Sequence, residues 1–431
     1  MTEQQIKYEA FVKDDLANNR GRIVNSMKEI DYLIHNPDAC EIIRKNYLND
    51  ILTFATLYSH FYKQYVDYKS LSDFPIVDKN VYREYWDDIS VKEYSERPDS
   101  RVKFTSGSTG TPFKMVLDRA RHCRWIAGNR VFREIIGLKS HDKAVFASES
   151  ITDKHIPMDR QIRDNVFYYD LIYISSKGVN DFIDYLTSNE VHYLTILASA
   201  LDRICQEIKS GNVKEWTGHF DGIVTMSDAL KDSTRKIASE YFKCPVYDMY
   251  GNEEFGVIAS EDGSGKGMLV NTADLWVEVL KIEKDEPAEE GEVGRLVITD
   301  LHNKAFPMIR YEIGDLASVI HDEDGRLYLN KLAGRKADML YTTDKRPVFY
   351  FHVISLLLPY QDIRQFQLVQ EDYHHFTWIL NTENHNYEEM IIRHSKELFG
   401  DDSEYTFRYV DSIPKLKSGK VRMTVCNINI K

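Results

Sequence analysis

The sequence predicts an α/β protein with two domains, a large one over 1–334 and a small α+β domain over 335–431. Three observations support this prediction. The 431 residues exceed the usual size of one domain, and 43% of them are hydrophobic, enough for a large core. Strand-like and helix-like runs alternate over roughly 102–258, as they do in parallel sheets covered by helices. The pattern then breaks at GRKAD, and new short strands follow Gly334.

Each region has its own hydrophobic pattern. From Tyr8 to about Tyr68, apolar residues recur every three or four positions, which predicts a helical layer. The alternating region contains the strand-like runs KAVFASES, VFYYDLIYIS, VHYLTILAS, DGIVTMS and CPVYDMYG, and the helical run DSTRKIASEYF. The stretch from LWVEVLKIE to LASVIHDEDGRLYLN predicts a small antiparallel sheet or barrel, with DEDG as a hairpin turn. The last region carries the strands QFQLVQ, FTWILN and YTFRYV and the helix YEEMIIRHSKELF.

Composition excludes several classes of protein. The net charge of −13 argues against a nucleic-acid partner, because holding a phosphate backbone needs a concentrated Lys/Arg surface. The N-terminus lacks the apolar core of a signal peptide, and no run approaches the ~20 apolar residues of a membrane span. We therefore expect a cytoplasmic protein without a membrane span. The five cysteines are far apart and lack metal-ligand spacing, so reduced structural thiols are expected.

The sharpest local signal is the loop FTSGSTGTP, directly before the strand-like run FKMVL. Its glycines let the backbone approach an anion, and its hydroxyl and N–H groups can donate hydrogen bonds to phosphate oxygens. The alternative for such a loop alone is a flexible surface turn. It is not a Walker loop, since no GK[ST] closes it. The candidate phosphate-binding residues are Thr105, Ser106, Gly107, Ser108, Thr109 and Gly110.

This loop resembles the phosphate-binding signature of the acyl-adenylate-forming superfamily, which includes acyl-CoA synthetases, peptide-synthetase adenylation domains and luciferases. Four more segments match in the same order: VYDMYGNEEFG, PMIRYEIGDLA, AGRKADML and IPKLKSGKVR. With DFPIVDK upstream, the resemblance covers nearly the whole chain and is strongest to the phenylacetate-CoA ligase and CapK-like branch. It implies a large N-terminal adenylate-forming domain of parallel sheets with helices plus a small β barrel, followed by a mobile C-terminal domain.

The resemblance also assigns roles around a nucleotide. It implies that Tyr250 lies against adenine with Gly251 beside it, that Glu254 binds Mg²⁺, that Asp315 holds the ribose hydroxyls and that Arg335 lies near the ribose. Magnesium takes one or two protein carboxylates plus phosphate oxygens, and a short carboxylate can accept from both ribose hydroxyls. Taken alone, Tyr250 would more often be a core aromatic residue and Asp315 a turn cap.

The same resemblance makes Lys420 the catalytic lysine, carried by the glycine loop of the C-terminal domain. Its ammonium group would neutralise the carboxylate and the charge developing on phosphorus. The segment TMSDAL matches a less specific stretch that lines the adenine, so Ser227 and Asp228 are secondary candidates. Glu253 is a weaker metal candidate than its neighbour, because it falls on a variable motif position.

The departures from the family pattern concern mainly the second half-reaction. Ala337 occupies the hinge position where relatives usually carry Asp or Lys. The following stretch, YTTDKRPVFYFHV, lacks the glycine that accommodates a pantetheine arm. Glu312 and Ile313 replace a usual basic residue and Thr, which is a milder change. These differences bear on the acceptor and leave adenylation untouched.

The expected function is ATP- and Mg²⁺-dependent activation of a carboxylic acid as acyl-AMP with release of pyrophosphate. Transfer to a thiol would follow, with either CoA or a carrier-protein phosphopantetheine as the partner. One alternative is delivery to an amine or hydroxyl acceptor, and another is a non-catalytic adenylate-binding protein. The retained Lys420, Glu254 and Asp315 argue against the last. The nearest branch implies an aromatic or small acid.

Overall fold

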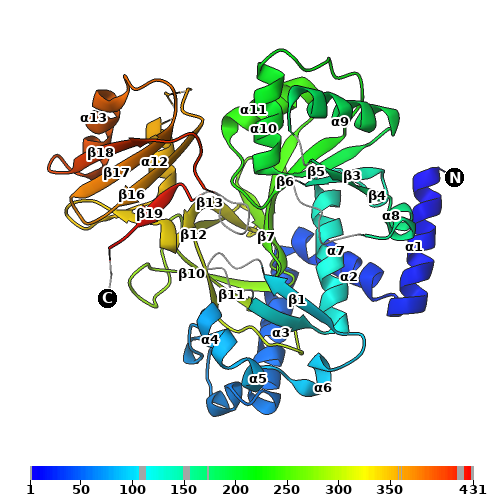
Figure 1. Cartoon of the computed structure of the whole chain (residues 1–431). Coiled ribbons are helices and arrows are strands. Elements are labelled where there is room, and N and C mark those ends of the chain that lie inside the picture. Colours follow the sequence, from blue (N-terminus) through cyan, green and yellow to red (C-terminus); the bar gives the residue numbers. More distant parts are fainter. Residues whose placement is uncertain are drawn as a thin grey trace.

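A computed structural model describes residues 2–105, 113–148, 156–171, 174–357, 359–360, 362–414 and 422–428. These residues form an 11-stranded sheet with helices on both faces, and a separate four-stranded sheet follows toward the C-terminus (Figure 1). The predicted fold class, α/β with a smaller α+β part, is confirmed.

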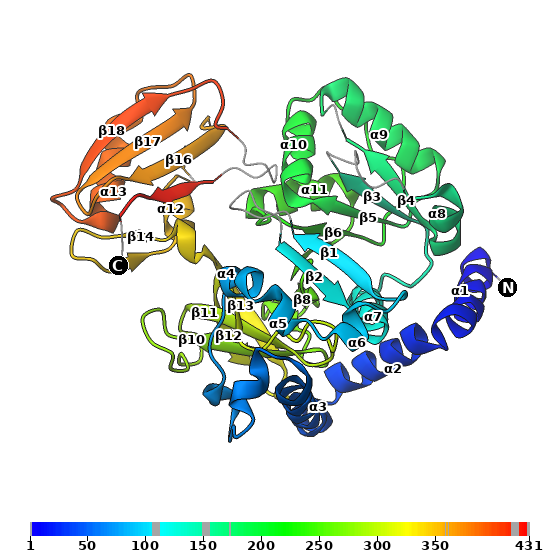
Figure 2. The same ribbon diagram turned by 60° about the horizontal axis from the view of Figure 1, so that its bottom comes forward.

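The N-terminal layer is helical, as predicted, and runs along one side of the molecule (Figure 2). The first helix begins where Thr2 and Gln5 form a capping box, which satisfies two free N–H groups. The second helix buries residues three and four apart, such as Ile23, Met27 and Ile30. The helices and short turns of this region are α1 (Glu3–Asn19), α2 (Arg22–His35), α3 (Pro37–Tyr58), η1 (Tyr62–Tyr65), η2 (Leu71–Asp73), α4 (Lys79–Glu84), α5 (Trp86–Ile89) and α6 (Lys92–Ser95).

Five parallel strands form one half of the large sheet, in the order β7-β6-β5-β3-β4. Successive side chains alternate between the two faces, so Tyr193 packs with α2 and α7 while Leu194 packs among α9, α10 and α11. The strands are β3 (Ala144–Ser148), β4 (Val166–Asp170), β5 (Tyr193–Leu197), β6 (Gly222–Met226) and β7 (Val246–Asn252). The helices are α7 (Arg119–Ile135), α8 (Met158–Asp164), α9 (Ser176–Ser188), α10 (Ala198–Lys209) and α11 (Asp232–Phe242).

Six antiparallel strands form the other half of this sheet, in the order β10-β11-β12-β13-β9-β8. The β-patterned stretch therefore does not stand apart as its own sheet, because β8 pairs directly with β7. The predicted DEDG turn is present, with the Gly325 N–H donating to the Asp322 carbonyl over 3.0 Å. The strands are β8 (Gly256–Glu261), β9 (Met268–Val270), β10 (Leu275–Leu280), β11 (Gly294–Asp300), β12 (Tyr311–His321) and β13 (Leu327–Arg335).

A two-stranded hairpin, β1 (Arg101–Thr105) and β2 (Phe113–Leu117), lies beside the large sheet. Its register places Thr105 opposite Phe113. The intervening residues 106–112, which include most of the predicted phosphate loop, lie outside the described residues.

The C-terminal part has its own core, in which Trp378 and Phe376 are fully enclosed. Its sheet has the order β18-β17-β16-β19. The elements after β13 are η3 (Lys336–Asp338), β14 (Leu340–Tyr341), β15 (Pro347–Val348), α12 (Tyr350–Leu357), β16 (Gln365–Gln370), β17 (His375–Asn381), α13 (Glu388–Phe399), β18 (Glu404–Tyr409) and β19 (Thr424–Cys426). The domain boundary at 334/335 remains a prediction.

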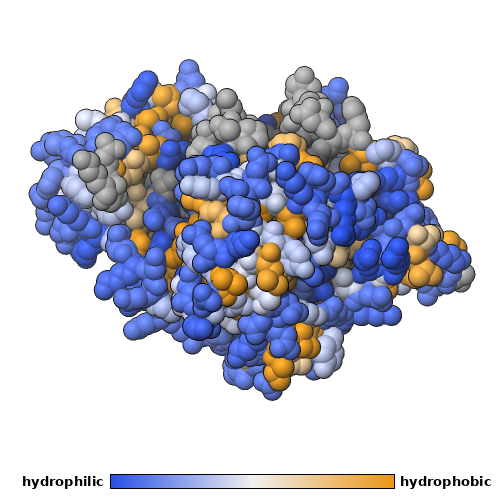
Figure 3. Space-filling model, turned by 90° about the horizontal axis from the view of Figure 1, so that it is seen from below, coloured by the Kyte–Doolittle hydropathy of each residue, from blue (hydrophilic) through white to orange (hydrophobic). Residues whose placement is uncertain are grey.

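The surface seen from below is mostly hydrophilic, with separate hydrophobic spots (Figure 3). In the part of the chain that the structure describes, no helix is long and apolar enough to cross a membrane. All five cysteines are free thiols, and burial raises the pKa of Cys205 and Cys244 to about 12, in agreement with the expected structural role.

Candidate active site

A cleft of about 3700 Å³ extends from α1, α2 and α7 past the large sheet to the C-terminal part. It exceeds the ~300–1,000 Å³ of an ordinary small-molecule site, so it can hold a nucleotide together with a second substrate. Seven of the site residues predicted from the sequence line it: Ser227, Asp228, Tyr250, Gly251, Glu254, Asp315 and Arg335.

Tyr250 and Asp315 are in direct contact, although 65 positions separate them. The Tyr250 Oη donates a 2.5 Å hydrogen bond to Asp315 Oδ2. Arg335 lies opposite Asp315 in the β12–β13 register, with its Nε 3.4 Å from Asp315 Oδ1. Burial, and then the Asp315 charge, hold the pKa of Tyr250 well above its usual value. The phenol therefore stays protonated and can act as a donor throughout the physiological pH range.

Glu254 is buried, with 6% of its surface exposed. Its Oε1 lies 4.0 Å from Lys79 Nζ and accepts a 3.5 Å hydrogen bond from Tyr311 Oη. Burial raises its pKa above the usual value, while the Lys79 charge opposes this shift. The described residues include no group of three or more His, Cys, Asp or Glu side chains placed to hold a metal. A cation at Glu254 would therefore need oxygen ligands from a bound substrate.

Glu253 has a different partner from its neighbour. Its Oε2 is 3.0 Å from Lys103 Nζ, and that ammonium group lies 4.1 Å from the centre of the Trp125 ring. The sequence motif ranks Glu253 below Glu254 as a candidate metal ligand.

The tight β7–β8 hairpin requires glycine at position 251 for steric reasons. A Cβ at this position would collide with the carbonyl oxygen of Gly256. The glycine therefore lets β8 fold back closely on β7, with Glu254 in the turn between the two strands.

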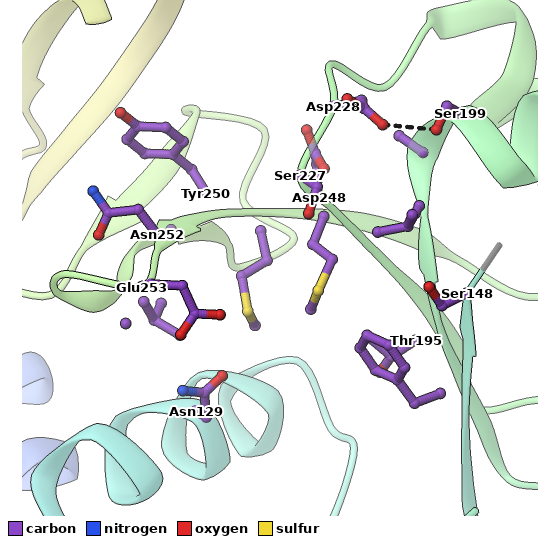
Figure 4. Close-up of a pocket in the computed structure, with 18 of the residues that line it drawn as sticks. Asn129, Ser148, Thr195, Ser199, Ser227, Asp228, Asp248, Tyr250, Asn252 and Glu253 are labelled. Carbon is purple, nitrogen blue, oxygen red and sulfur yellow. Dashed lines mark hydrogen bonds between the residues drawn. The ribbon is translucent and has the colours of Figure 1, made fainter. Parts of the chain in front are cut away.

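Ser227 and Asp228 lie at the end of β6, where parallel strands end at the cleft. Ser227 adopts the left-handed conformation with φ of 75°, which is uncommon for a residue other than glycine and frequent near functional sites. Asp228 Oδ2 accepts a 2.7 Å hydrogen bond from Ser199 Oγ (Figure 4).

Sequence reasoning missed Asp248 on β7, which lines the same cleft and is drawn among its lining residues in Figure 4. Its Oδ1 accepts a 2.7 Å hydrogen bond from Thr225 Oγ1, and burial raises its pKa to about 6. The signal was available, since residues two apart on a strand share a face and Asp248 is two before Tyr250. Lys79 was also missed as a site residue, although it closes the DFPIVDK segment.

The remaining predicted residues lie outside the described residues. They are Ser106, Gly107, Ser108, Thr109, Gly110 and Lys420, together with the side chain of Thr105. Close to Lys420 in sequence, Arg422 is described, and its Nε donates a 2.9 Å hydrogen bond to Asp338 Oδ1. Thr424 Oγ1 donates to the Asp338 carbonyl. The chain just after the lysine loop is thus tied to the segment between the two parts.

Comparisons with known proteins show which proteins this chain resembles. Residues 340–427 match the family model described as the CapK C-terminal domain. Protein CapK from Staphylococcus aureus is 23% identical over 382 residues, which cover 83% of this chain and 81% of CapK. The predicted resemblance to CapK-like proteins is confirmed.

Solved structures of low identity share the fold. One is 2-hydroxyisobutyryl-CoA ligase in the postadenylation state with R3-HIB-AMP, with a TM-score of 0.68, 15% identity and coverage of 88% of both chains. ATP-bound MatB from Rhodopseudomonas palustris has a TM-score of 0.55 and 16% identity, over 74% of this chain and 66% of MatB. The phenylacetate-CoA ligase subtype stays a prediction.

Proposed function

We propose that this protein uses ATP to convert a carboxylic acid into an acyl-adenylate with release of pyrophosphate, and then transfers the acyl group to a thiol. The observation that carries the proposal is the contact between Tyr250 and Asp315 in one cleft with Glu254. A protonated phenol, the carboxylate that accepts its hydrogen bond and a buried carboxylate match the needs of a nucleoside, a ribose and a phosphate-bound cation.

Asp315 would bind the ribose hydroxyls. A carboxylate has about four acceptor positions, of which the Tyr250 hydroxyl and the Arg335 guanidinium occupy one on each oxygen. The other positions stay available for two hydroxyl donors. Because its two neighbours fix its orientation before ATP binds, little entropy would be lost on binding.

The adenine would lie between the Tyr250 ring and the end of β6. Asp248 and Ser227 both line the cleft there, and a carboxylate at this place can accept a hydrogen bond from an exocyclic amine. Ser227 and Asp228 would then line the base rather than contact phosphate.

A magnesium ion fits Glu254, which offers one carboxylate at the cleft, with the Tyr311 hydroxyl and the Lys79 ammonium group as neighbours. When bound, the ion would neutralise phosphate charge. Glu254 would hold it, and Lys79 would add a second positive charge close by. The repulsion between the acid and the α-phosphate is the main obstacle to the reaction, and these charges reduce it.

Lys420 and the loop over 106–110 would complete the site. We propose that the loop binds the phosphates through its N–H and hydroxyl groups, and that Lys420 contacts the carboxylate and the α-phosphate. The 334/335 boundary would then act as a hinge that carries Lys420 toward and away from the cleft, as lids and domains do in many enzymes.

The acceptor is proposed to be the thiol of CoA or of a carrier protein. The acyl-AMP complex of the hydroxyisobutyryl ligase, which has this fold, supports the order of adenylation before transfer. The alternative is an amine or hydroxyl acceptor, favoured by the uncharged Ala337 at the hinge position.

The test is acid-dependent exchange of labelled pyrophosphate into ATP, measured over a panel of carboxylic acids with Mg²⁺ and no thiol. We expect exchange with a subset of acids and none without acid. Glu254→Gln should abolish most of it, whereas the neighbouring Glu253→Gln is the matched control and should retain it. Absence of exchange with every acid would contradict the proposal.

A further inference from the structure

One end of the cleft is strongly cationic, although the whole chain carries a net charge of −13. Arg22, Arg101, Arg119 and Arg160 line it, contributed by α2, β1, α7 and α8 respectively. We call these four residues the arginine wall. Arg101 lies opposite Leu117 in the β1–β2 register, two residues before Arg119, and Arg119 donates a hydrogen bond to Asn19, three residues before Arg22. The wall is therefore built by the tertiary fold rather than by a charge run in the sequence.

Three of the four wall arginines act electrostatically on His122. Burial, followed by the charges of Lys103, Arg101, Arg119 and Arg160, lowers its pKa to about 4. Its imidazole is therefore neutral at pH 7, and its buried Nδ1 has no hydrogen-bond partner in the described part of the chain. A neutral ring with an unused nitrogen, enclosed by cations, is suited to contact an anion.

The wall has few counter-charges. Among the described residues, the structure records no ion pair between a carboxylate and Arg22, Arg101 or Arg119. Arg119 donates instead to the side-chain oxygen of Asn19. Arg160 pairs loosely with Asp164, at 3.5 Å. Positive charge that the fold gathers without neutralising it creates a local field that attracts anions.

The wall is connected to the reaction centre along α7. Arg119, His122, Ile126 and Asn129 recur every three or four residues, so they share one face of that helix, and all four line the cleft. Asn129 lies across the pocket from Tyr250, on the α7 side (Figure 4). At 1.5 Å per residue, Arg119 lies about 15 Å along the axis from Asn129.

The wall also lies on the side of the large sheet away from the C-terminal sheet. Figures 1 and 2 both show α7 and α8 on one side, with β16 to β19 on the other. Tyr250, Asp315 and Arg335 belong to β7, β12 and β13, which Figure 1 shows between these two sides. A ligand that extends from the reacting carboxylate along α7 therefore runs away from the proposed nucleotide.

We propose that the acid activated here carries a second anionic group, a carboxylate or a phosphate, which Arg101, Arg119 and Arg160 bind at the N-terminal end of α7. This inference rests on the proposed adenylating function and specifies its substrate class. Arginine suits the role because its planar guanidinium donates two parallel hydrogen bonds to either anion. His122 would add a neutral donor.

The test is pyrophosphate exchange without any thiol, using α,ω-dicarboxylic acids of increasing length, each paired with its monomethyl ester. One range of lengths should be preferred, because the wall lies at a fixed distance from Glu254. Within that range, kcat/KM for the diacid should exceed that for its ester by about tenfold or more, as charge-assisted hydrogen bonds allow. Omitting the thiol removes the phosphates of CoA as a source of anion.

Arg101→Gln and Arg119→Gln should each reduce this diacid-to-ester ratio by about threefold or more, and the double variant should bring it near one. Arg346→Gln is the matched control, since it removes an exposed arginine that pairs with Asp344 far from the wall, and it should leave the ratio unchanged. The readout is a ratio, so partial unfolding of a variant would not imitate the effect.

The inference is overturned if esters and diacids react equally at every length, or if the arginine variants lower both rates alike. It is also overturned if those variants change only the KM for CoA in thioester formation, since the wall would then bind the acceptor. In each of these outcomes monoacids still support exchange, so the adenylating function survives. Loss of exchange with every acid would instead remove that function, and this inference with it.

Discussion

The Tyr250 hydroxyl donates a 2.5 Å hydrogen bond to Asp315 and thereby joins β7 of the parallel half-sheet to β12 of the antiparallel half. Two motifs that are far apart in sequence become one preformed binding surface. Because Arg335 pairs with the other carboxylate oxygen, the Asp315 side chain is held from two sides. We therefore expect different effects on ATP binding from substitutions at Tyr250 and at Asp315.

Tyr250→Phe should weaken ATP binding while the protein remains folded. The substitution keeps the ring but removes the donor, so Asp315 loses one of its two supports. A hydrogen bond to a charged group contributes about 1.5–3 kcal/mol, so KM for ATP should rise roughly tenfold or more. Steady-state kinetics with varied ATP measures this, and an unchanged KM would show that the hydroxyl does not orient Asp315.

Asp315→Ala should raise KM for ATP more than Tyr250→Phe does, with a smaller change in kcat. Ribose contacts are made about equally in the ground state and the transition state, so their loss affects binding rather than chemistry. The discriminating comparison uses dATP, or another adenine nucleoside triphosphate that lacks ribose hydroxyls, in place of ATP. The variant should no longer prefer ATP over such analogues, and a retained preference would place the ribose elsewhere.

Glu254→Gln should abolish Mg²⁺-dependent activity and yet raise the thermal stability at neutral pH. Burial raises the pKa of Glu254, so the folded state binds its proton more tightly than the unfolded state does. The free energy of unfolding therefore falls as pH rises from the usual carboxyl pKa through the raised value, and the ionised group is destabilising above it. Glutamine carries no charge, so Glu254→Gln removes this destabilisation at neutral pH.

Thermal melts without ligand at about pH 7.5 and about pH 4 test this sign, since ordinary glutamate titrates near 4.3. The stabilisation by Glu254→Gln should be larger at the higher pH and shrink at the lower one. Glu253→Gln is the control, because that side chain is more exposed and pairs with Lys103. A Glu254→Gln variant that melts lower at neutral pH would contradict the account.

Asp338 and Arg422 should be energetically coupled in the adenylation step. Their 2.9 Å contact ties the chain beyond Lys420 to the segment that follows β13. In a double-mutant cycle with Asp338→Asn and Arg422→Gln, the coupling should be about 0.5–3 kcal/mol. Additive effects on the adenylation rate would mean that this ion pair does not position the lysine loop.

Lys420→Ala should slow acyl-adenylate formation by about a hundredfold to a thousandfold, the usual effect of deleting one preorganised charge-stabilising donor. Transfer from a supplied acyl-adenylate should change much less, because the proposed hinge would carry the lysine away for that step. Single-turnover measurement of each step decides the matter. An equal slowing of both steps would contradict the division of labour.

The sequence predicted the secondary structure closely where hydrophobic periodicity was strong. The C-terminal strand QFQLVQ became β16 over Gln365–Gln370, and YEEMIIRHSKELF contains α13 over Glu388–Phe399. What periodicity could not predict was long-range pairing. The antiparallel strands continue the parallel sheet because β8 folds back on β7, and this depends on a close backbone approach at Gly251.

Site residues were predicted from the sequence only where they belong to a recognisable motif. Tyr250 and Asp315 were both identified, but nothing in either motif indicated that they touch, since this contact depends on the register of distant strands. Asp248 was missed because a lone acid inside a strand carries no motif, although its alternation with Tyr250 placed it on the same face. The sequence did not predict the arginine wall, because its four arginines come from four separate helices and strands.

The central claim is that the acid becomes an acyl-adenylate, and isotope transfer from the acid tests it most directly. The protein would be incubated with ATP, Mg²⁺, an acid labelled with ¹⁸O in its carboxylate and the acceptor, and the products analysed by mass spectrometry. Attack of the carboxylate on the α-phosphate, followed by attack of the acceptor at the acyl carbon, leaves one carboxylate oxygen on AMP. The account predicts AMP that carries a single ¹⁸O, with unlabelled pyrophosphate. Unlabelled AMP, or ADP with labelled inorganic phosphate, would contradict it.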